Sequence, residues 1–345
     1  MNNKNIESIK KLVTPYELKN NLNLKYDERV FIEESRLEIN KIINGGSSKK
    51  LIIVGPCSIH NYDECIDYAL KLKKMISEFD NLYIVIRIYL EKPRTIAGWK
   101  GFLYDPELNE SNNIMLGLEK SRKLLIEITK MRIPIATEFL DTIIPQYIDD
   151  LISWGCIGAR TVESQLHRQL ASGLSMSIGF KNRTDGDVMV AINGMLSSKN
   201  PHAFLGIDIN GCSSIINTSG NNNSCIVLRG GGGNKNLDKN SLESIIKMCK
   251  KNKCNQNLIL DISHDNSLVN NKKIFKEQIN NIDYLCSILN NKNDLSVVGI
   301  MIESNINEGN QKISKSMKYG VSITDGCISL EDTYICLKKL NKSII

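Results

Sequence analysis

Six basic side chains follow short apolar stretches of this 345-residue chain, at positions where strands could end. They are Arg87, Lys92, Arg94, Arg160, Lys181 and Arg229. Cations that converge repel one another unless anions neutralise them, and guanidinium groups match the oxygens of phosphate and carboxylate in pairs. An ion pair with a surface acid could explain any one of the six, but hardly all of them together. The set therefore predicts one or more small, highly anionic ligands.

A second group offers sulfur, nitrogen and oxygen donors: Cys57, His264, Glu303 and Asp325. Such side chains can form one site for a divalent cation, and mixed donors do not select among Mn, Fe, Co and Zn. No short ligand spacing joins these residues, and a lone histidine or cysteine is more often a satisfied core residue. The metal site is therefore a prediction that depends on the fold bringing the four residues together.

Eight short, β-rich segments alternate with amphipathic helices over most of the chain. They are residues 51–54, 83–88, 134–139, 156–159, 177–180, 225–228, 257–262 and 296–302. Most are continuous apolar runs, typical of parallel strands covered on both faces, and their number indicates a (β/α)8 (TIM) barrel. A doubly wound open sheet is the alternative, but no GxGxxG follows the first strand. Since barrel active sites lie at the carboxyl ends of the strands, both groups of side chains, with Glu138, are expected at one end.

Two segments lie outside this alternation of strands and helices. Residues 1–48 are expected to form an N-terminal extension with a helix at 27–44, which Gly45 and Gly46 would end. Residues 49–345 would form the barrel, with a β-hairpin inserted at about 204–217. Its turn is expected at Asn210-Gly211, a dipeptide suited to a type I′ turn.

Composition narrows the classes of function. Lysine and arginine total 44 against 38 acidic residues, a formal charge of +6, and no block of five like charges occurs. Aromatic residues make up only 6%, so a nucleic-acid-binding surface is not expected. The ten cysteines form no CxxC pair, as is usual for reduced thiols in a cytoplasmic protein. No run approaches the about 18 apolar residues of a membrane span, so neither a nucleic acid nor a membrane is an expected partner.

Several longer motifs carry a family resemblance. They are GPCSIH (55–60), EKPRT (91–95), TEFLD (137–141), SWGCIGARTVESQLHR (153–168), GFKNRTDG (179–186), LRGG (228–231), IESNINEGNQ (302–311) and YGVSITDGCIS (319–329). In this order they make the chain resemble the type I, microbial and feedback-regulated 3-deoxy-D-arabino-heptulosonate 7-phosphate (DAHP) synthases. The resemblance runs from about residue 8 to 340. It implies a (β/α)8 barrel that condenses phosphoenolpyruvate with erythrose 4-phosphate, at the entrance to the shikimate pathway.

The resemblance also implies roles for individual residues. One divalent metal ion (Mn, Fe, Co or Zn) would be held by Cys57, His264, Glu303 and Asp325. Phosphoenolpyruvate would be bound by Arg87, Lys92, Arg160, Lys181 and Arg229. Erythrose 4-phosphate would be bound by Lys92, Pro93, Arg94, Thr95 and Asp325. The catalytic groups would be Lys92 as the proton donor, Glu138 beside a reacting water, and His264.

Relatives of this type are usually oligomers that an aromatic amino acid inhibits. The effector site would involve Pro145, Gln146, Ser175, Gly206 and Ile216. Gly206, together with residues 317–325, slightly favours tyrosine as the effector. A homodimer or homotetramer is expected.

The sequence departs from the family pattern at a few positions. Arg183 stands where relatives commonly have glycine, and it would be strained if that position needs a positive φ. The glycine-rich run 230–233 lacks the usual Lys-x-Pro-Asn-Tyr and is expected to form a tight turn. A sister enzyme that uses arabinose 5-phosphate and a non-catalytic amino-acid-binding relative remain alternatives. The KPRT stretch (92–95) favours the four-carbon sugar, and no expected ligand or lysine is lost.

Overall fold

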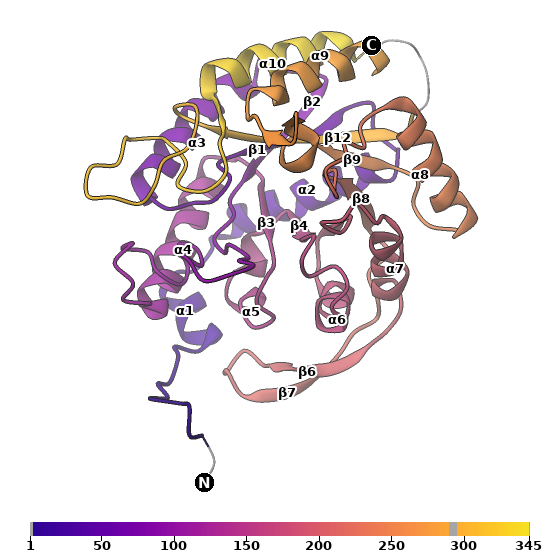
Figure 1. The fold of residues 1–345 in the computed structure, drawn as a ribbon. Coiled ribbons are helices and arrows are strands. Elements are labelled where there is room, and N and C mark those ends of the chain that lie inside the picture. The colour runs from indigo at the N-terminus through magenta and orange to yellow at the C-terminus, as the bar shows by residue number, and fades with distance from the viewer. Residues whose placement is uncertain (1–2, 290–294, 345) are drawn as a thin grey trace.

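Eight parallel strands close into a barrel in the computed structural model, which describes residues 3–289 and 295–344 (Figure 1). The strands are β1 (Lys50–Gly55), β2 (Leu82–Arg87), β3 (Ile135–Glu138), β4 (Trp154–Ile157), β5 (Ser177–Lys181), β8 (Ser224–Leu228), β9 (Leu258–Asp261) and β12 (Val297–Asn305). They pair in this order, and β12 returns to β1, where Gly299 lies opposite Leu51. The predicted (β/α)8 barrel is confirmed, with strand boundaries shifted by a few residues.

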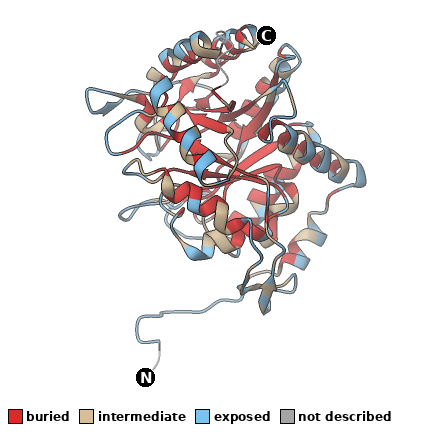
Figure 2. Ribbon diagram, turned by 90° about the vertical axis from the view of Figure 1, so that its right-hand side faces the viewer, coloured by how far each residue is buried: buried red, intermediate tan, exposed pale blue. Residues whose placement is uncertain are grey.

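Helices cover the outside of the barrel, with buried inner faces and exposed outer ones (Figure 2). They are α3 (Tyr62–Ile76), α4 (Ile114–Lys130), α5 (Pro145–Ile148), α6 (Gln165–Gly173), α7 (Met189–Ser198), α8 (Lys239–Lys251), α9 (Glu277–Leu289) and α10 (Leu330–Ser343). In α3, the side chain of Asn61 caps the first turn, and Cys65, Tyr68 and Leu72 form the buried stripe. No helix in the described ranges is both long and apolar enough to cross a membrane.

Inward-facing side chains, which alternate with outward-facing ones along each strand, make the interior of the barrel apolar below the carboxyl ends of the strands. Its buried members include Leu51, Val85, Trp154, Val227 and Met301. Helix α2 (Tyr26–Ile43) closes this end by packing Ile39, Ile42 and Ile43 into the same cluster. Gly179 makes room for the indole, because a Cβ there would lie 2.3 Å from Trp154 Cζ2. Gly179→Ala is therefore expected to overpack the core at a cost of about 1–3 kcal/mol.

Strands β6 (Ala203–Ile207) and β7 (Ser213–Asn217) form the antiparallel hairpin expected between the fifth and sixth barrel strands. The expected type I′ turn is wrong. Such a turn needs a positive φ at both central residues, and here Gly211 has one (73°) but Asn210 does not. The carboxylate of Asp208 instead accepts the backbone N–H groups of Asn210 and Cys212, both at 2.9 Å. Local hydrogen bonding by this aspartate therefore produces a wider loop.

The N-terminal helix α1 (Pro15–Asn21) lies beside the hairpin loop. A capping box formed by Thr14 and Glu17 begins the helix. The backbone N–H of Tyr16 donates to the carbonyl oxygen of Ile209 at 2.8 Å. The N-terminal region and the inserted hairpin, distant in sequence, are thus joined on one side of the barrel.

Candidate functional site

The interior of the barrel is polar at the carboxyl ends of the strands. Its inward positions at the strand ends are Arg87, Glu138, Lys181, Arg229, Asp261 and Glu303, all buried. Side chains two residues apart on a strand point to the same face. Arg87 follows Val85 by two residues and Glu303 follows Met301 by two, and Val85 and Met301 belong to the apolar interior. The same alternation that places apolar side chains in the barrel interior therefore points these charged side chains inward at the carboxyl end of the barrel.

A cavity of about 280 Å³ opens at this end. Eleven of the predicted site residues line it: Arg87, Lys92, Pro93, Arg94, Thr95, Glu138, Arg160, Lys181, Arg229, His264 and Asp325. Glu303 lines an adjoining cavity of about 140 Å³, which shares His264 and Asp325 with the first. Residues from the ends of many different strands thus meet at one place.

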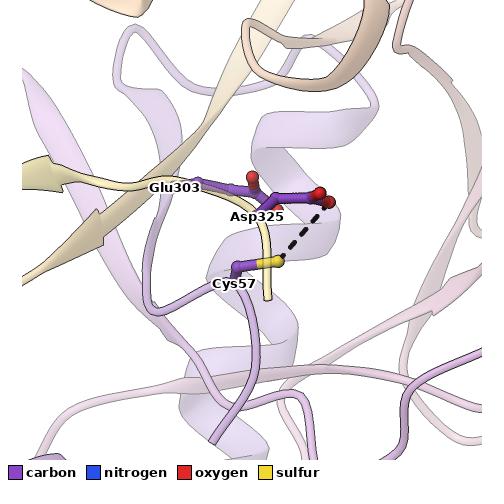
Figure 3. A group of neighbouring side chains, drawn as sticks. All are labelled: Cys57, Glu303 and Asp325. Carbon is purple, nitrogen blue, oxygen red and sulfur yellow. Dashed lines mark hydrogen bonds between the residues drawn. The ribbon is translucent and has the colours of Figure 1, made fainter. Parts of the chain in front are cut away.

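Cys57, Glu303 and Asp325 form a compact metal-capable group, with one potential ligand atom of each within 4.8 Å of the others (Figure 3). The sulfur of Cys57 lies 3.8 Å from Asp325 Oδ2. The predicted fourth ligand, His264, lies outside this group of three, with its Nε2 3.9 Å from Glu303 Oε1. Sulfur and oxygen donors this close together, with an imidazole beside them, fit one divalent transition metal.

The ionisation of the group favours a metal at the histidine and the aspartate, whereas the thiol must lose a proton before it can bind one. Burial, and then the neighbouring Glu303, raises the pKa of the Cys57 thiol to about 11. Burial lowers the pKa of His264, which favours the neutral imidazole that metals bind. Burial opposes the ionisation of Asp325, but Lys92, His264, Lys273 and Arg87 together outweigh it and hold the pKa of that carboxyl well below its usual range.

Lys92 connects this group to the main cavity. Its ammonium donates to Cys57 Sγ at 3.1 Å and lies 3.6 Å from Asp325 Oδ2. Burial disfavours its charge, but Cys57, Asp325 and Glu303 together raise the pKa of Lys92 above its usual value. The lysine therefore carries a proton at the edge of the metal-capable group.

The deep cations of the cavity are paired with acids. Arg87 Nη2 lies 3.0 Å from Glu303 Oε1, and the Arg87 guanidinium stacks 3.7 Å from the centre of the Tyr89 ring. Lys181 pairs with Asp261 at 3.0 Å. Burial opposes the charge of Lys181, but Asp261 together with Cys156 and Glu138 outweighs it and raises the pKa of the lysine. These pairs keep the cations charged in a buried site.

The cations of the rim are different. Arg94 donates to the carbonyl oxygen of Trp99 at 2.8 Å, and Arg160 donates to the hydroxyl of Thr95 at 3.3 Å. Within the described ranges neither of them forms an ion pair, and both line the cavity. Cations without acidic partners can accept an anionic ligand without first breaking an ion pair.

Glu138 adds a carboxylate to the cavity wall. It stands against Gly158, where an added Cβ would lie 2.0 Å from Glu138 Oε1. Any other residue at position 158 would displace the carboxylate. Glycine here therefore determines where the oxygen atoms of Glu138 lie.

Sequence reasoning missed Asp261, Asp265 and Lys273. Asp261 could have been found, because it stands two residues after the inward Ile259. Asp265 pairs with Arg229 at 3.2 Å. Lys273 lines both cavities from the small hairpin β10 (Leu268–Val269) and β11 (Lys272–Lys273). No periodicity in the sequence predicted that hairpin.

The expected effector residues lie away from this cavity. Pro145 and Gln146 open the short helix α5, and Ser175 is exposed just before β5. Gly206 and Ile216 lie on the hairpin, where a Cβ at 206 would be 2.9 Å from Ile216 Cγ1. Their regulatory role stays a prediction.

Arg183 is not strained, since its φ is not positive. Its guanidinium pairs with Asp185 at 2.6 Å and with Glu163 at 2.6 Å, on the rim of the barrel. The run 230–233 turns as expected, with positive φ at Gly230 (69°), Gly232 (58°) and Gly233 (82°). Neither departure removes a residue from the cavity.

The fold and site define a (β/α)8-barrel protein with a cationic cavity beside a metal-capable group. A family model described as the DAHP synthetase I family matches residues 21–338, and the chain belongs to that family. A phospho-2-dehydro-3-deoxyheptonate aldolase, Tyr-sensitive, from Escherichia coli is 41% identical over 100% of this chain and 96% of its own length. A tyrosine-inhibited aldolase of the same name from Candida albicans is 42% identical over 96% of this chain and 91% of its own.

A Trp-sensitive aldolase from Escherichia coli is 40% identical over 97% of this chain and 96% of its own length. The solved structure of phospho-2-dehydro-3-deoxyheptonate aldolase from Francisella tularensis SCHU S4 superimposes with a TM-score of 0.95. It is 43% identical and covers 99% of this chain and 98% of its own. The similarity therefore extends over the whole barrel, the N-terminal helices and the hairpin.

Proposed function

We propose that this chain is a metal-dependent DAHP synthase. It condenses phosphoenolpyruvate with erythrose 4-phosphate and water to give DAHP and phosphate, the first step towards chorismate. The observation that carries this proposal is the cavity in which cations for two anionic substrates border the group Cys57, Glu303 and Asp325, with His264 beside it. Membership of the DAHP synthetase I family supports the same reaction.

Phosphoenolpyruvate is held by the deep cations and one rim residue: Arg87, Lys92, Arg160, Lys181 and Arg229. Guanidinium and ammonium groups bind its carboxylate and phosphate oxygens. The acids that pair with these cations keep most of them fixed before the substrate arrives. Binding then orients the enol carbon towards the second substrate, which lowers the entropic cost of the reaction.

Erythrose 4-phosphate binds along Lys92, Pro93, Arg94 and Thr95, with Asp325 near its aldehyde end. Cys57, His264, Glu303 and Asp325 would hold a divalent metal (Mn, Fe, Co or Zn). When bound, that metal supplies Lewis acidity to polarise the aldehyde. Lys92 gives its proton to the aldehyde oxygen as the enol carbon attacks the carbonyl carbon.

Carbon–carbon bond formation leaves positive charge at C2 of the former phosphoenolpyruvate. Water adds to C2, oriented by Glu138, which also takes a proton from it. The adduct then loses phosphate, and C2 becomes the ketone of the product. His264 contributes to catalysis through its place in the metal-holding group.

Regulation and assembly form a further part of the proposal. Residues 1–48 and the hairpin make up a regulatory and oligomer-forming region attached to the catalytic barrel, 49–345. Leu205 and Ile215 lie directly opposite each other on β6 and β7, and both are largely exposed, which supports packing of the hairpin against another copy in a homodimer or homotetramer. An aromatic amino acid, with tyrosine favoured, binds near Pro145, Gln146, Ser175, Gly206 and Ile216. A cytoplasmic location rests on the cysteine usage and stays a prediction.

A coupled assay tests the reaction. Metal-stripped protein receives phosphoenolpyruvate and either erythrose 4-phosphate or arabinose 5-phosphate, with and without Mn²⁺. Metal-dependent phosphate release with the four-carbon sugar alone is expected. Release with the five-carbon sugar would favour the sister enzyme, and no release by folded, metal-binding protein would favour a non-catalytic relative. Tyrosine, phenylalanine and tryptophan added in turn test the effector, and no response to tyrosine would refute that choice.

A further inference from the structure

Asp261 ends β9 and is completely buried, and both of its carboxylate oxygens have partners. Oδ2 lies 3.0 Å from Lys181 Nζ and 2.9 Å from His264 Nδ1. Oδ1 accepts the Ser263 backbone N–H at 3.1 Å and the Ser263 hydroxyl at 2.6 Å. One oxygen atom is therefore shared between a lysine of the phosphoenolpyruvate set and a histidine of the metal set.

Asp261 and Ser263 together orient the His264 ring. Nδ1 lies 2.9 Å from Asp261 Oδ2 and 2.8 Å from the hydroxyl of Ser263, which itself donates to Asp261, so Nε2 is left on the side of the metal-capable group, 3.9 Å from Glu303 Oε1. The backbone of His264 adopts a positive φ of 52°, which residues with a Cβ rarely do. The hydrogen bonds between Asp261 and Ser263 support that turn. Carboxylates in this position orient metal-binding histidines and increase their affinity.

The same oxygen restrains Lys181. A cation on Nε2 would strengthen the hydrogen bond that Nδ1–H donates to Asp261 Oδ2. That oxygen would then be shared less with Lys181, and the ammonium would be more available to an anion in the cavity. Metal at one end of Asp261 should therefore favour an anion at the other.

We propose that Asp261 is a positioning residue that couples metal binding at His264 to phosphoenolpyruvate binding at Lys181, so that each ligand tightens the other. The inference rests on the proposed function and deepens it. Because coupling between two binding sites is reciprocal, it can be measured from either ligand.

Asp265 offers a matched control. It is also a carboxylate paired with a cation of the phosphoenolpyruvate set, since its Oδ1 lies 3.2 Å from Arg229 Nη2. Its carboxylate has no ion pair with Lys181, and it belongs to the same short helical turn as His264. Asp265→Asn therefore removes a similar charge nearby without breaking the bridge between the two sites.

Calorimetric titrations of the full chain test the proposal. Mn²⁺ is titrated into stripped protein, and phosphoenolpyruvate into stripped and Mn²⁺-loaded protein. In the wild type, Mn²⁺ is expected to tighten phosphoenolpyruvate binding by about fivefold or more. Asp261→Asn should weaken Mn²⁺ binding by about 10–100-fold and reduce the coupling to less than about twofold. Asp265→Asn should weaken phosphoenolpyruvate alone and keep both the Mn²⁺ affinity and the coupling.

The outcomes distinguish a failure of the proposed function from a failure of the coupling through Asp261. A folded wild type that binds neither Mn²⁺ nor phosphoenolpyruvate would refute the proposed function itself. A wild type that binds both, but independently of each other, would overturn the role of Asp261 whatever the variants do. Equal effects of Asp261→Asn and Asp265→Asn on Mn²⁺ affinity would also overturn it.

Discussion

The ammonium nitrogen of Lys92 lies 3.1 Å from the sulfur of Cys57, so the proposed proton donor touches a proposed metal ligand. The two residues come from loops that follow neighbouring strands, β2 and β1. An aldehyde oxygen bound beside the metal-capable group would lie within reach of that proton. In the proposed mechanism, carbonyl activation and proton transfer therefore act on the same oxygen atom.

Removal of the proton donor should separate chemistry from metal binding. Lys92→Ala is expected to lower kcat by a factor of about 10²–10⁴, the usual contribution of a general acid. Metal affinity should persist, since the thiol, imidazole and carboxylates remain. Steady-state assays and Mn²⁺ titration of the same preparation measure both. Lys100→Ala, an exposed lysine of the same loop, is the control, and near-normal turnover of Lys92→Ala would refute the acid role.

Metal binding should depend on pH through Cys57. Its pKa of about 11 means that the thiol is protonated at neutral pH, and a metal must displace that proton. Apparent affinity should therefore rise about tenfold per pH unit between roughly pH 7 and 9. Competition with a chelator at several pH values measures the slope. Cys57→Ser should bind metal weakly and lose the slope, whereas a slope that Cys57→Ser retains would exclude the thiol as a ligand.

Lys273 should contribute to the binding of the aldehyde substrate. It lines both cavities and contributes a cation near Asp325, so Lys273→Ala is expected to raise the KM for erythrose 4-phosphate about fivefold. Lys272→Ala is the matched control, because the adjacent strand residue points to the opposite face. Initial-rate kinetics with each substrate varied measure the effect. An increase confined to the KM for phosphoenolpyruvate would contradict this assignment.

Arg183→Gly should change activity little. The Arg183 guanidinium is held by Glu163 and Asp185 on the rim and does not line the cavity. Because these pairs are exposed and screened by solvent, they contribute little to the stability of the fold. The variant is expected to keep kcat/KM within about twofold of the wild type, a change of less than about 0.5 kcal/mol. A large gain in activity would show that Arg183 impairs the site.

Glu91 should make stability depend on pH in an unusual direction. Burial raises its pKa to about 8, while Leu140 and Asp141 donate backbone N–H groups to it. Since the folded protein retains a proton that the unfolded chain releases above about pH 4.3, the stability that this proton provides is present below that pH. It is lost as pH rises towards 8. The free energy of unfolding should fall by up to about 1.4 kcal/mol per pH unit in this window.

Urea denaturation of the wild type and Glu91→Gln between about pH 5 and 8.5 measures this effect. The variant should lose the slope that Glu91 contributes. Glu107→Gln, at an exposed position of the same loop, should keep it. Parallel curves for wild type and Glu91→Gln would show that Glu91 is ionised throughout.

The sequence by itself determined the barrel and most of its chemistry. Apolar runs such as 225–228 are typical of strands buried on both faces, and a charged residue that follows such a run, as Arg229 does, is expected at the carboxyl end of the barrel. Local composition is enough for both conclusions, because strand formation and burial depend on neighbouring residues. The family motifs then allowed roles to be assigned to individual side chains.

Only the tertiary structure decided which groups touch. Asp261 bridges Lys181 and His264 because the parallel register of β5, β8 and β9 brings these segments together. The wide loop at Asp208, the small hairpin that carries Lys273 and the unstrained Arg183 depend on local side-chain contacts that leave no periodic pattern. Distances between residues far apart in the chain follow from strand pairing, and no property of either segment alone determines them.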